Sequence, residues 1–384
     1  MTIAYIMRYW PVYGGGETVT AALANELVRR GHIVHILYAY NSIGNPMPYS
    51  IDKRIRQVEI NTVDNTTENV AAVATYLREH HVDMMINQWG NQQLCYEAKL
   101  LSETPLIMCW HMCFLRDLPP VTIKQKLYKV VAGSKRYKDW RAAIQLKMHL
   151  EQYKTSDRYV FLSAAYEQEF LKLAGEQVHA DKVTSVANPL TYQQSYDINH
   201  YAEKKKEVLF VGRMEETHKR LSYILRIWKL IETDKSLNDW NLRIVGDGPS
   251  MQPTRHLCTA LGLQRVSFEG FKPPQPYYIE SSIFMMTSAF EGFPMTLVES
   301  LQNAVVPVVM DSFLALHDVI TDGVNGMIVQ NDDINGFAWT MKRLMKDDRY
   351  RKRLAQKGLE TCQEFELGKI VDKWESLFEM IISE

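Results

Sequence analysis

Short apolar runs bounded by turn residues recur along the whole chain. Such runs are typical of strands buried on both faces of a parallel sheet. They lie at 3–7, 33–39, 83–87, 106–110, 159–162, 208–211, 242–245, 283–286 and 305–310.

Between these runs lie segments whose apolar residues have helical spacing. One places Val19, Leu23 and Leu27 on a single face and closes at residues 29–31, two arginines followed by a glycine. The alternation of strands and helices predicts doubly wound α/β sheets.

The alternation is interrupted between residues 188 and 206. This stretch is polar and charged, and the apolar pattern restarts at residue 207. We therefore predict an N-terminal Rossmann-like domain over 1–195 and a C-terminal Rossmann-like domain over 196–366. A last helix, 367–384, has one apolar stripe and is expected to pack back towards the N-terminal domain. Two such domains place the C-terminal ends of their strands, and therefore a ligand crevice, at a cleft between them.

Composition and charge exclude several classes of protein. A length of 384 residues suits two domains, and 19 Gly with 14 Pro are too few for a collagen or a low-complexity chain. The 44 Lys and Arg residues nearly cancel the 45 Asp and Glu residues. Because a nucleic-acid binder usually carries a basic excess, we expect no nucleic-acid partner.

Cysteine usage and the lack of long apolar windows indicate a cellular compartment. Five scattered cysteines without zinc-finger spacing are typical of buried thiols in a reducing environment. The first apolar run is too short for the core of a signal peptide. No window approaches the roughly 18–20 apolar residues that cross a bilayer. We expect a cytoplasmic protein.

Three glycines and a glutamate, residues 14–17, follow the first predicted strand and open the first helix. Glycine lets the backbone approach a ligand, and a helix N-terminus presents N–H groups to an anion. The segment is not the GxGxxG fingerprint, and an ordinary tight turn into a helix explains it equally well. The ligand interpretation therefore depends on other motifs.

Two cations and two carboxylates follow later strands. Arg213 and Lys219 stand where a strand ends and a helix begins, a position suited to clamping a diphosphate, although a solvated basic face is the alternative. Loss of either cation is expected to lower turnover far more than stability. Glu291 and Glu299 stand eight positions apart, and Gly-Phe-Pro at 292–294 starts the helix that carries Glu299. Carboxylates accept hydrogen bonds from sugar or ribose diols, and helix-start amides hold phosphate, so a sugar nucleotide fits both.

The Glu-x7-Glu spacing, followed by Pro-Val-Val at 307–309, resembles the signature of the retaining nucleotide-sugar glycosyltransferases of family 4, the group 1 glycosyl transferases with the GT-B fold. Further segments are similar to that family in the same order: GGGE, RRGHIV, IMCWH ending at His111, VFLS, ANP, VGR with KR, LRIVGDGP, VSFEGF and DGVNGMIV. The resemblance is strongest over 207–329 and weakest over 41–87 and 114–155. It implies two Rossmann-like doubly wound domains facing across a cleft.

Carried over residue by residue, the resemblance implies a donor site. Arg213 and Lys219 would bind the donor diphosphate, Glu291 would lie against the transferred sugar, and His111 would approach that sugar. A histidine that ends a buried strand also occurs simply as hydrogen-bonded structure, and this alternative stays open. The implied donor-binding residues are Gly15, Gly16, Gly212, Gly248, Phe271, Gly292, Phe293, Pro294, Met295 and Glu299.

Two details depart from the family pattern or restrict the chemistry. The interval from Arg213 to Lys219 is one residue longer than usual, so the phosphate contact is Lys219 or Arg220, and Lys219 is preferred. No Asp-x-Asp triplet occurs, so the sequence lacks the motif that would most readily indicate a Mg²⁺–diphosphate site. We expect no metal and no cofactor, a UDP-sugar or GDP-sugar as co-substrate, and cations that neutralise the leaving group.

A basic segment covers residues 116–158. It holds eleven Lys and Arg residues against four Asp and Glu residues, interleaved with apolar and aromatic residues. Such a segment is suited to contact with an anionic membrane surface, and a solvated pair of helices is the alternative. The expected location is therefore the cytoplasm, with peripheral contact at the inner face of the cell membrane.

The resemblance implies a retaining transferase. It would move a hexose or N-acetylhexosamine from a nucleotide-diphosphate sugar to an acceptor hydroxyl, in the synthesis of a bacterial surface polysaccharide, lipopolysaccharide or glycolipid. The acceptor would be a glycan or a lipid-linked glycan. Three alternatives stay open. One is a non-catalytic scaffold that binds sugar nucleotide in a glycan assembly complex. The other two are enzymes of the same fold, a sugar-nucleotide epimerase and a phosphorylase, which would need inorganic phosphate or pyridoxal phosphate.

Overall fold

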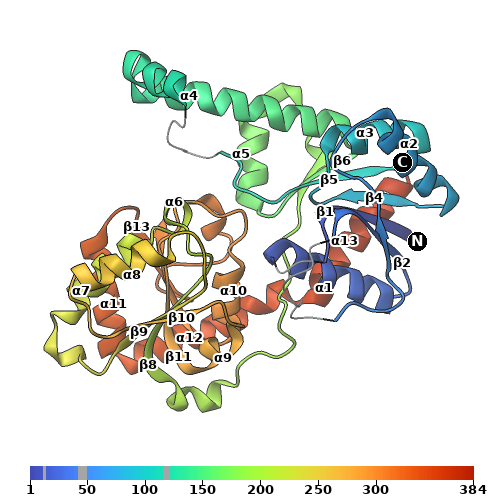
Figure 1. Ribbon diagram of the computed structural model, residues 1–384. Helices are drawn as coiled ribbons and strands as arrows, with labels where there is room; N and C mark the ends of the chain where they lie inside the picture. The colour runs from blue at the N-terminus through green and yellow to red at the C-terminus, as the bar shows by residue number, and fades with distance from the viewer. Residues whose placement is uncertain (12–13, 42–49, 116–121) are drawn as a thin grey trace. The chain divides into compact units, whose positions relative to one another are not determined.

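The computed structural model describes residues 1–11, 14–41, 50–115 and 122–384. The chain divides into two compact units, each built around one parallel β-sheet (Figure 1). Unit 1 comprises Met1–Pro189 and Leu367–Glu384, and unit 2 comprises Leu190–Glu366.

Unit 1 contains a seven-stranded parallel sheet in the order β3-β2-β1-β4-β5-β6-β7. The strands are β1 (Thr2–Tyr9), β2 (Ile33–Tyr40), β3 (Arg56–Glu59), β4 (Met84–Asn87), β5 (Leu106–Trp110), β6 (Arg158–Phe161) and β7 (Val183–Ser185). Its α-helices are α1 (Gly15–Arg29), α2 (Thr67–Glu79), α3 (Gln92–Ser102), α4 (Ile123–Thr155), α5 (Ala164–Ala174) and α13 (Leu367–Ile382). The strand order reverses between β1 and β4, which is the switch point where doubly wound sheets bind ligands.

Helix α1 shows how sequence pattern becomes packing in unit 1. Val19, Leu23 and Leu27 are buried, as their spacing predicts. Gly31 follows the helix with φ +96°, a conformation that glycine adopts without steric cost. Helix α1 packs on α13, and Arg30 donates hydrogen bonds to Asp372 and Glu375 of α13 at 2.5 Å each. The apolar stripe of α13 is buried within unit 1.

Unit 2 contains a six-stranded parallel sheet in the order β10-β9-β8-β11-β12-β13. The strands are β8 (Lys205–Val211), β9 (Asn241–Val245), β10 (Val266–Gly270), β11 (Ser281–Met286), β12 (Val306–Asp311) and β13 (Met327–Gln330). Its α-helices are α6 (Glu216–Lys219), α7 (Leu221–Glu232), α8 (Met251–Ala260), α9 (Gln275–Glu280), α10 (Met295–Gln302), α11 (Ile334–Lys346) and α12 (Asp348–Cys362). The order reverses between β8 and β11, so the switch point of unit 2 lies between these strands.

All nine predicted apolar runs are strands, and the fold class is confirmed. Strands β3, β7, β10 and β13 lie outside these nine runs. Each is an edge strand of three to five residues that lacks a continuous buried run. The five cysteines are buried and free, as predicted. No helix within the described ranges combines the length and apolarity needed to cross a bilayer.

Candidate active site

The switch point of unit 2 brings together two of the predicted catalytic residues. Lys219 ends the short helix α6, which follows β8, and Glu291 lies in the loop after β11. The Nζ atom of Lys219 donates a hydrogen bond to Oε1 of Glu291 at 2.5 Å. Both side chains are about nine-tenths buried. A buried ion pair therefore joins the loops that follow β8 and β11.

The neighbouring His218 also lies against Glu291. Its Nε2 atom lies 3.4 Å from Oε2 of Glu291, and its ring stacks on Phe290 with centroids 4.6 Å apart. Burial by itself raises the pKa of Glu291, but the charge of Lys219 and the nearby His218 imidazole outweigh burial and lower the pKa to about 2. Glu291 is therefore a carboxylate throughout the neutral range.

Backbone contacts fix the two loops against each other. The amide of Ala289 donates a hydrogen bond to the carbonyl of His218 at 2.7 Å. The hydroxyl of Thr287 donates to the carbonyl of Lys219 at 2.8 Å. These bonds hold the ends of β8 and β11 in one arrangement, so the Lys219–Glu291 pair is preorganised. Sequence analysis missed His218 and Thr287, although His218 stands next to the predicted lysine.

The other predicted cation, Arg213, is solvent exposed. Its side chain is 71% exposed, and its Nε atom lies 3.8 Å from Oε2 of Glu215. Arg220, the alternative phosphate contact, is directed elsewhere, because its guanidinium donates to Asn331 at 2.6 Å and to Asp332 at 3.2 Å. The structure thus brings Lys219, and not Arg220, to Glu291.

Two of the predicted glycines follow β8 and β9. Gly248 has φ +156°, and a Cβ atom there would lie 2.6 Å from the carbonyl oxygen of Met214. Only glycine permits this close approach of the two loops. At Gly212 a Cβ atom would lie 3.3 Å from the Cε atom of Lys219. Both glycines therefore shape the loops around Lys219, and donor contact by either stays a prediction.

Glu299 lies on α10, half-buried, one turn into the helix. The hydroxyl of Tyr278, on α9, donates to its Oε2 atom at 3.0 Å. Burial raises the pKa of Glu299 to about 7, and the Tyr278 hydrogen bond opposes that rise. The carboxyl therefore titrates near neutral pH. No motif in the sequence pairs Tyr278 with Glu299.

The predicted phosphate-binding segment, residues 292–295, leads into α10. Pro294 is the N-cap residue and Met295 the first helical residue. Phe293 is buried against Phe365, with ring centroids 5.5 Å apart, which anchors the segment. The first amides of any α-helix have no acceptor within the helix and suit an anion. Phe271, predicted to flank the base, is exposed just after β10.

Unit 1 gathers Gly16 and His111 around a residue that sequence analysis missed. Trp89 follows β4, and its ring stacks on His111 with centroids 4.5 Å apart. A Cβ atom on Gly16 would lie 2.7 Å from Nε1 of Trp89, whereas one on Gly15 would have no atom within 4 Å. The switch point of unit 1 therefore places the N-terminus of α1, Trp89 and His111 together.

Burial also sets the charge of His111. It lowers the pKa of His111 to about 4, so the imidazole is neutral at physiological pH. Its Nε2 atom is buried without a hydrogen-bond partner. A buried polar atom of this kind is costly unless a ligand or water satisfies it.

No group of three or more His, Cys, Asp or Glu side chains in the described part of the chain has a metal-binding arrangement.

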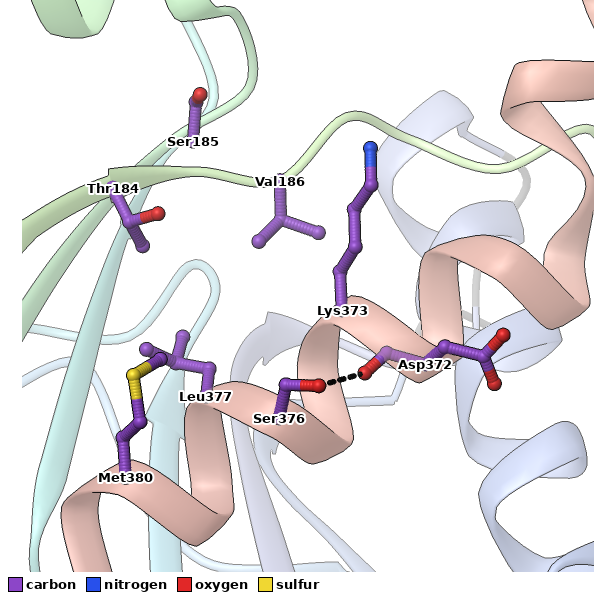
Figure 2. Close-up of a pocket in the computed structure, with 8 residues that line it drawn as sticks. All are labelled: Thr184, Ser185, Val186, Asp372, Lys373, Ser376, Leu377 and Met380. Carbon is purple, nitrogen blue, oxygen red and sulfur yellow. Dashed lines mark hydrogen bonds between the residues drawn. The ribbon is translucent and has the colours of Figure 1, made fainter.

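Unit 1 contains a groove of about 390 Å³ between β7 and α13, shown in Figure 2. It is lined by Thr184, Ser185, Val186, Asp372, Lys373, Ser376, Leu377 and Met380. None of the predicted site residues lines this groove, so it is separate from the candidate site.

Comparisons with known proteins identify the family. The model of glycosyltransferase family 4 matches residues 13–193, and the model of glycosyl transferases group 1 matches residues 193–361. The chain is a group 1, family 4 glycosyltransferase. The two matches meet at residue 193, close to the boundary between the two units.

Relatives of this glycosyltransferase build bacterial glycans. It is 23% identical over 369 residues to the GalNAc-alpha-(1->4)-GalNAc-alpha-(1->3)-diNAcBac-PP-undecaprenol alpha-1,4-N-acetyl-D-galactosaminyltransferase of Campylobacter jejuni, covering 94% of each chain. It is 24% identical to the lipopolysaccharide 1,6-galactosyltransferase of Salmonella typhimurium over 53% of this chain and 56% of that protein. The crystal structure of Anabaena Alr3699/HepE in complex with UDP has a TM-score of 0.72 at 16% identity, covering 99% of this chain and 100% of that one. The fold is therefore GT-B.

Proposed function

We propose that this glycosyltransferase moves a hexosyl or N-acetylhexosaminyl group from a UDP-sugar to a hydroxyl of a lipid-linked or polysaccharide acceptor, with retention at the anomeric carbon. The observation that carries the proposal is the buried Lys219–Glu291 pair at the switch point of unit 2. Relatives named as N-acetylgalactosaminyl and galactosyl transferases support the type of sugar. Structural neighbours with bound UDP or UDP-glucose favour UDP over GDP.

The charges of unit 2 suit the departure of a nucleoside diphosphate. As the bond from the anomeric carbon to the phosphate oxygen breaks, negative charge grows on that oxygen, and Lys219 with the exposed Arg213 would stabilise it. The leaving phosphate oxygen takes the proton of the acceptor hydroxyl, whose oxygen forms the new bond to the anomeric carbon. Neither a protein nucleophile nor a metal is needed in this proposal.

The carboxylates would bind the neutral parts of the donor. Glu291 is ionised and would accept hydrogen bonds from hydroxyls of the transferred sugar, while Glu299 would accept them from the ribose. The amides at the start of α10 would hold phosphate oxygens. In this assignment unit 2 is the donor domain. Roles for Gly15, Gly16 and His111 of unit 1 in donor binding, and for unit 1 in acceptor binding, are part of the same proposal.

The test is turnover of UDP-glucose, UDP-galactose and their N-acetyl forms, with GDP-mannose for comparison and EDTA throughout. A transferase releases UDP slowly even when water is the acceptor, and the anomeric configuration of the released sugar, followed by NMR before it mutarotates, reports retention. Lys219→Met and Arg213→Ala should each slow the release of UDP about 10²-fold or more, whereas Lys352→Met, on the exposed face of α12, should not. Donor bound and returned unchanged would favour the scaffold, and an altered sugar would favour the epimerase.

We further propose that the enzyme works at the cytoplasmic face of the cell membrane. Its five buried, free cysteines are compatible with a reducing compartment. Fractionation of cells that express a tagged enzyme would test this: recovery from the periplasm would contradict it.

A further inference from the structure

Residues 123–148 of α4, called here the α4 arm, expose an unusual number of large apolar side chains. Figure 1 shows α4 extending beyond the β-sheet of unit 1. Ile123, Val130 and Val131 are 84%, 81% and 77% exposed. The other exposed large apolar residues of the arm are Leu127, Tyr128, Trp140, Ile144 and Met148. When exposed apolar side chains gather into a contiguous patch, the patch marks an interaction site in a stable protein.

The exposed apolar residues form stripes on two helical segments. The arm is interrupted at Gly133, whose φ of 81° and ψ of 160° are not helical. Before the break, Ile123, Leu127, Val130 and Val131 follow the i, i+4, i+7, i+8 spacing of one helix face. Residues 140, 144 and 148 follow the i, i+4, i+8 spacing in the second segment. Each segment is therefore amphipathic. The apolar face of the first segment is exposed, and that of the second is partly covered, because Tyr137 on the same face is buried.

Aromatic packing joins the two segments into one body. Tyr137 is buried, and its ring lies 6.5 Å from that of Tyr128 and 5.8 Å from that of Trp140, measured between centroids. The Nζ atom of Lys129 lies 5.8 Å from the centroid of Tyr137. The two segments of the arm therefore contact each other through Tyr128, Tyr137 and Trp140.

The charge of the arm defines its partner. Residues 123–148 hold eight Lys and Arg residues against a single carboxylate, Asp139. A second copy of the chain would bring the same positive charge against it, which like-charge repulsion disfavours. An anionic lipid surface attracts the cations and accepts the apolar side chains at the boundary of the acyl chains.

We propose that the α4 arm docks the protein on an anionic lipid bilayer, with Ile123, Leu127, Val130 and Val131 inserted at the interface and the cations against lipid phosphates. The part of the basic segment at 116–121 lies outside the described residues. The inference does not depend on the proposed reaction, because lipid binding is measured without donor or acceptor.

The experiment is co-sedimentation of the full chain with vesicles of phosphatidylcholine alone or mixed with phosphatidylglycerol, at low and high salt. We expect binding only to the mixed vesicles, weakened by salt. Val130→Gln with Val131→Gln, and separately Lys135→Glu with Arg136→Glu, should each lower the partition coefficient about tenfold or more. The matched controls are Trp339→Gln and Lys352→Glu, exposed residues of unit 2, which should bind like the wild type.

The melting temperature of each variant shows whether the variant is folded, so that a loss of binding can be assigned to the altered arm. The proposal is overturned if the wild type does not bind the mixed vesicles, or if it binds them equally after both pairs of substitutions in the arm. It is also overturned if light scattering shows a dimer that the Val130 and Val131 substitutions dissociate, because the stripe would then be a contact between copies.

Discussion

The ammonium group of Lys219 and the carboxylate of Glu291 lie 2.5 Å apart, although the two residues are 72 positions apart in the chain. Lys219 ends α6, which follows β8, and Glu291 lies in the loop after β11. Both residues are buried at the switch point of unit 2. The pair is therefore part of the stability of the unit as well as a candidate for binding the donor.

Lys219→Met should lower both turnover and stability. It leaves Glu291 buried without its main counter-charge, which typically costs about 3–5 kcal/mol, and removes a preorganised cation worth about 10²–10³ in rate. The double variant Lys219→Met with Glu291→Leu should be more stable than Lys219→Met alone, because no buried charge is left unpaired. Thermal unfolding and initial rates measure both effects. A double variant less stable than either single variant would contradict this account of the pair.

Arg213→Ala should separate activity from stability. Among the described residues, the exposed Arg213 side chain has a single, distant ion pair, with Glu215. Its loss should therefore change the free energy of unfolding by less than about 0.5 kcal/mol. Turnover should fall by about 10² if Arg213 binds the diphosphate. Lys352→Ala is the matched control. For Arg213 the sequence-based prediction that activity falls far more than stability therefore stays unchanged, whereas for the buried Lys219 we expect both activity and stability to fall.

The affinity for UDP should rise with pH across the titration of Glu299. Its pKa is raised to about 7, and the ionised form is the better acceptor for ribose hydroxyls. Tyr278→Phe removes a hydrogen bond that lowers this pKa, so the rise should move to higher pH. Calorimetric titration at a series of pH values measures it, with Tyr223→Phe as the control. A pH profile unchanged in Tyr278→Phe would remove Tyr278 as a positioning residue.

The same carboxyl should make stability depend on pH. The folded state binds the proton of Glu299 more tightly than the unfolded chain, so its contribution is fully present below the ordinary pKa and is lost as pH rises through about 7. Glu299→Gln keeps an acceptor for Tyr278 but cannot ionise. It should therefore raise the free energy of unfolding, and with it the melting temperature, more above about pH 8 than below about pH 5. The two changes in free energy should differ by up to about 3 kcal/mol. Equal shifts at both pH values would contradict the raised pKa.

Gly15→Ala and Gly16→Ala should differ although the residues are adjacent. A methyl group on Gly16 meets the indole of Trp89, whereas one on Gly15 meets no atom within 4 Å. Gly16→Ala should displace Trp89 from His111 and lower kcat/KM about tenfold, since small misplacements of site groups are costly. The indole N–H resonance of Trp89, assigned with Trp89→Phe, should move only in Gly16→Ala. If Gly15→Ala and Gly16→Ala changed kcat/KM equally, the contact between residue 16 and Trp89 would have no role in the site.

His111 should remain neutral at physiological pH. Burial lowers its pKa to about 4, which NMR titration of the imidazole can follow. The unfolded chain binds this proton more tightly, so the stability that His111 contributes is present above about pH 6.5 and is lost as pH falls towards about 4. His111→Phe should flatten that part of the stability profile. An ordinary pKa measured for His111 would overturn this prediction.

The central strands could be predicted because their burial is written into the sequence. The run 3–7, for example, consists entirely of hydrophobic residues. A strand that lies between two layers of helices needs that composition. The edge strand β3 has mostly exposed residues, so no apolar run marks it. Its place follows from pairing with β2, a contact that local composition does not encode.

The sequence by itself determined the doubly wound domains, the glycine-rich start of α1, and the spacing that places Glu291 and Glu299 around one helix start. These features depend on neighbours along the chain. Only the tertiary structure decided that Lys219, and not Arg220, meets Glu291, that Tyr278 reaches Glu299, and that Trp89 lies between Gly16 and His111. The physical reason is that ion pairing, desolvation and steric fit depend on groups distant in sequence, which strand order and register bring together.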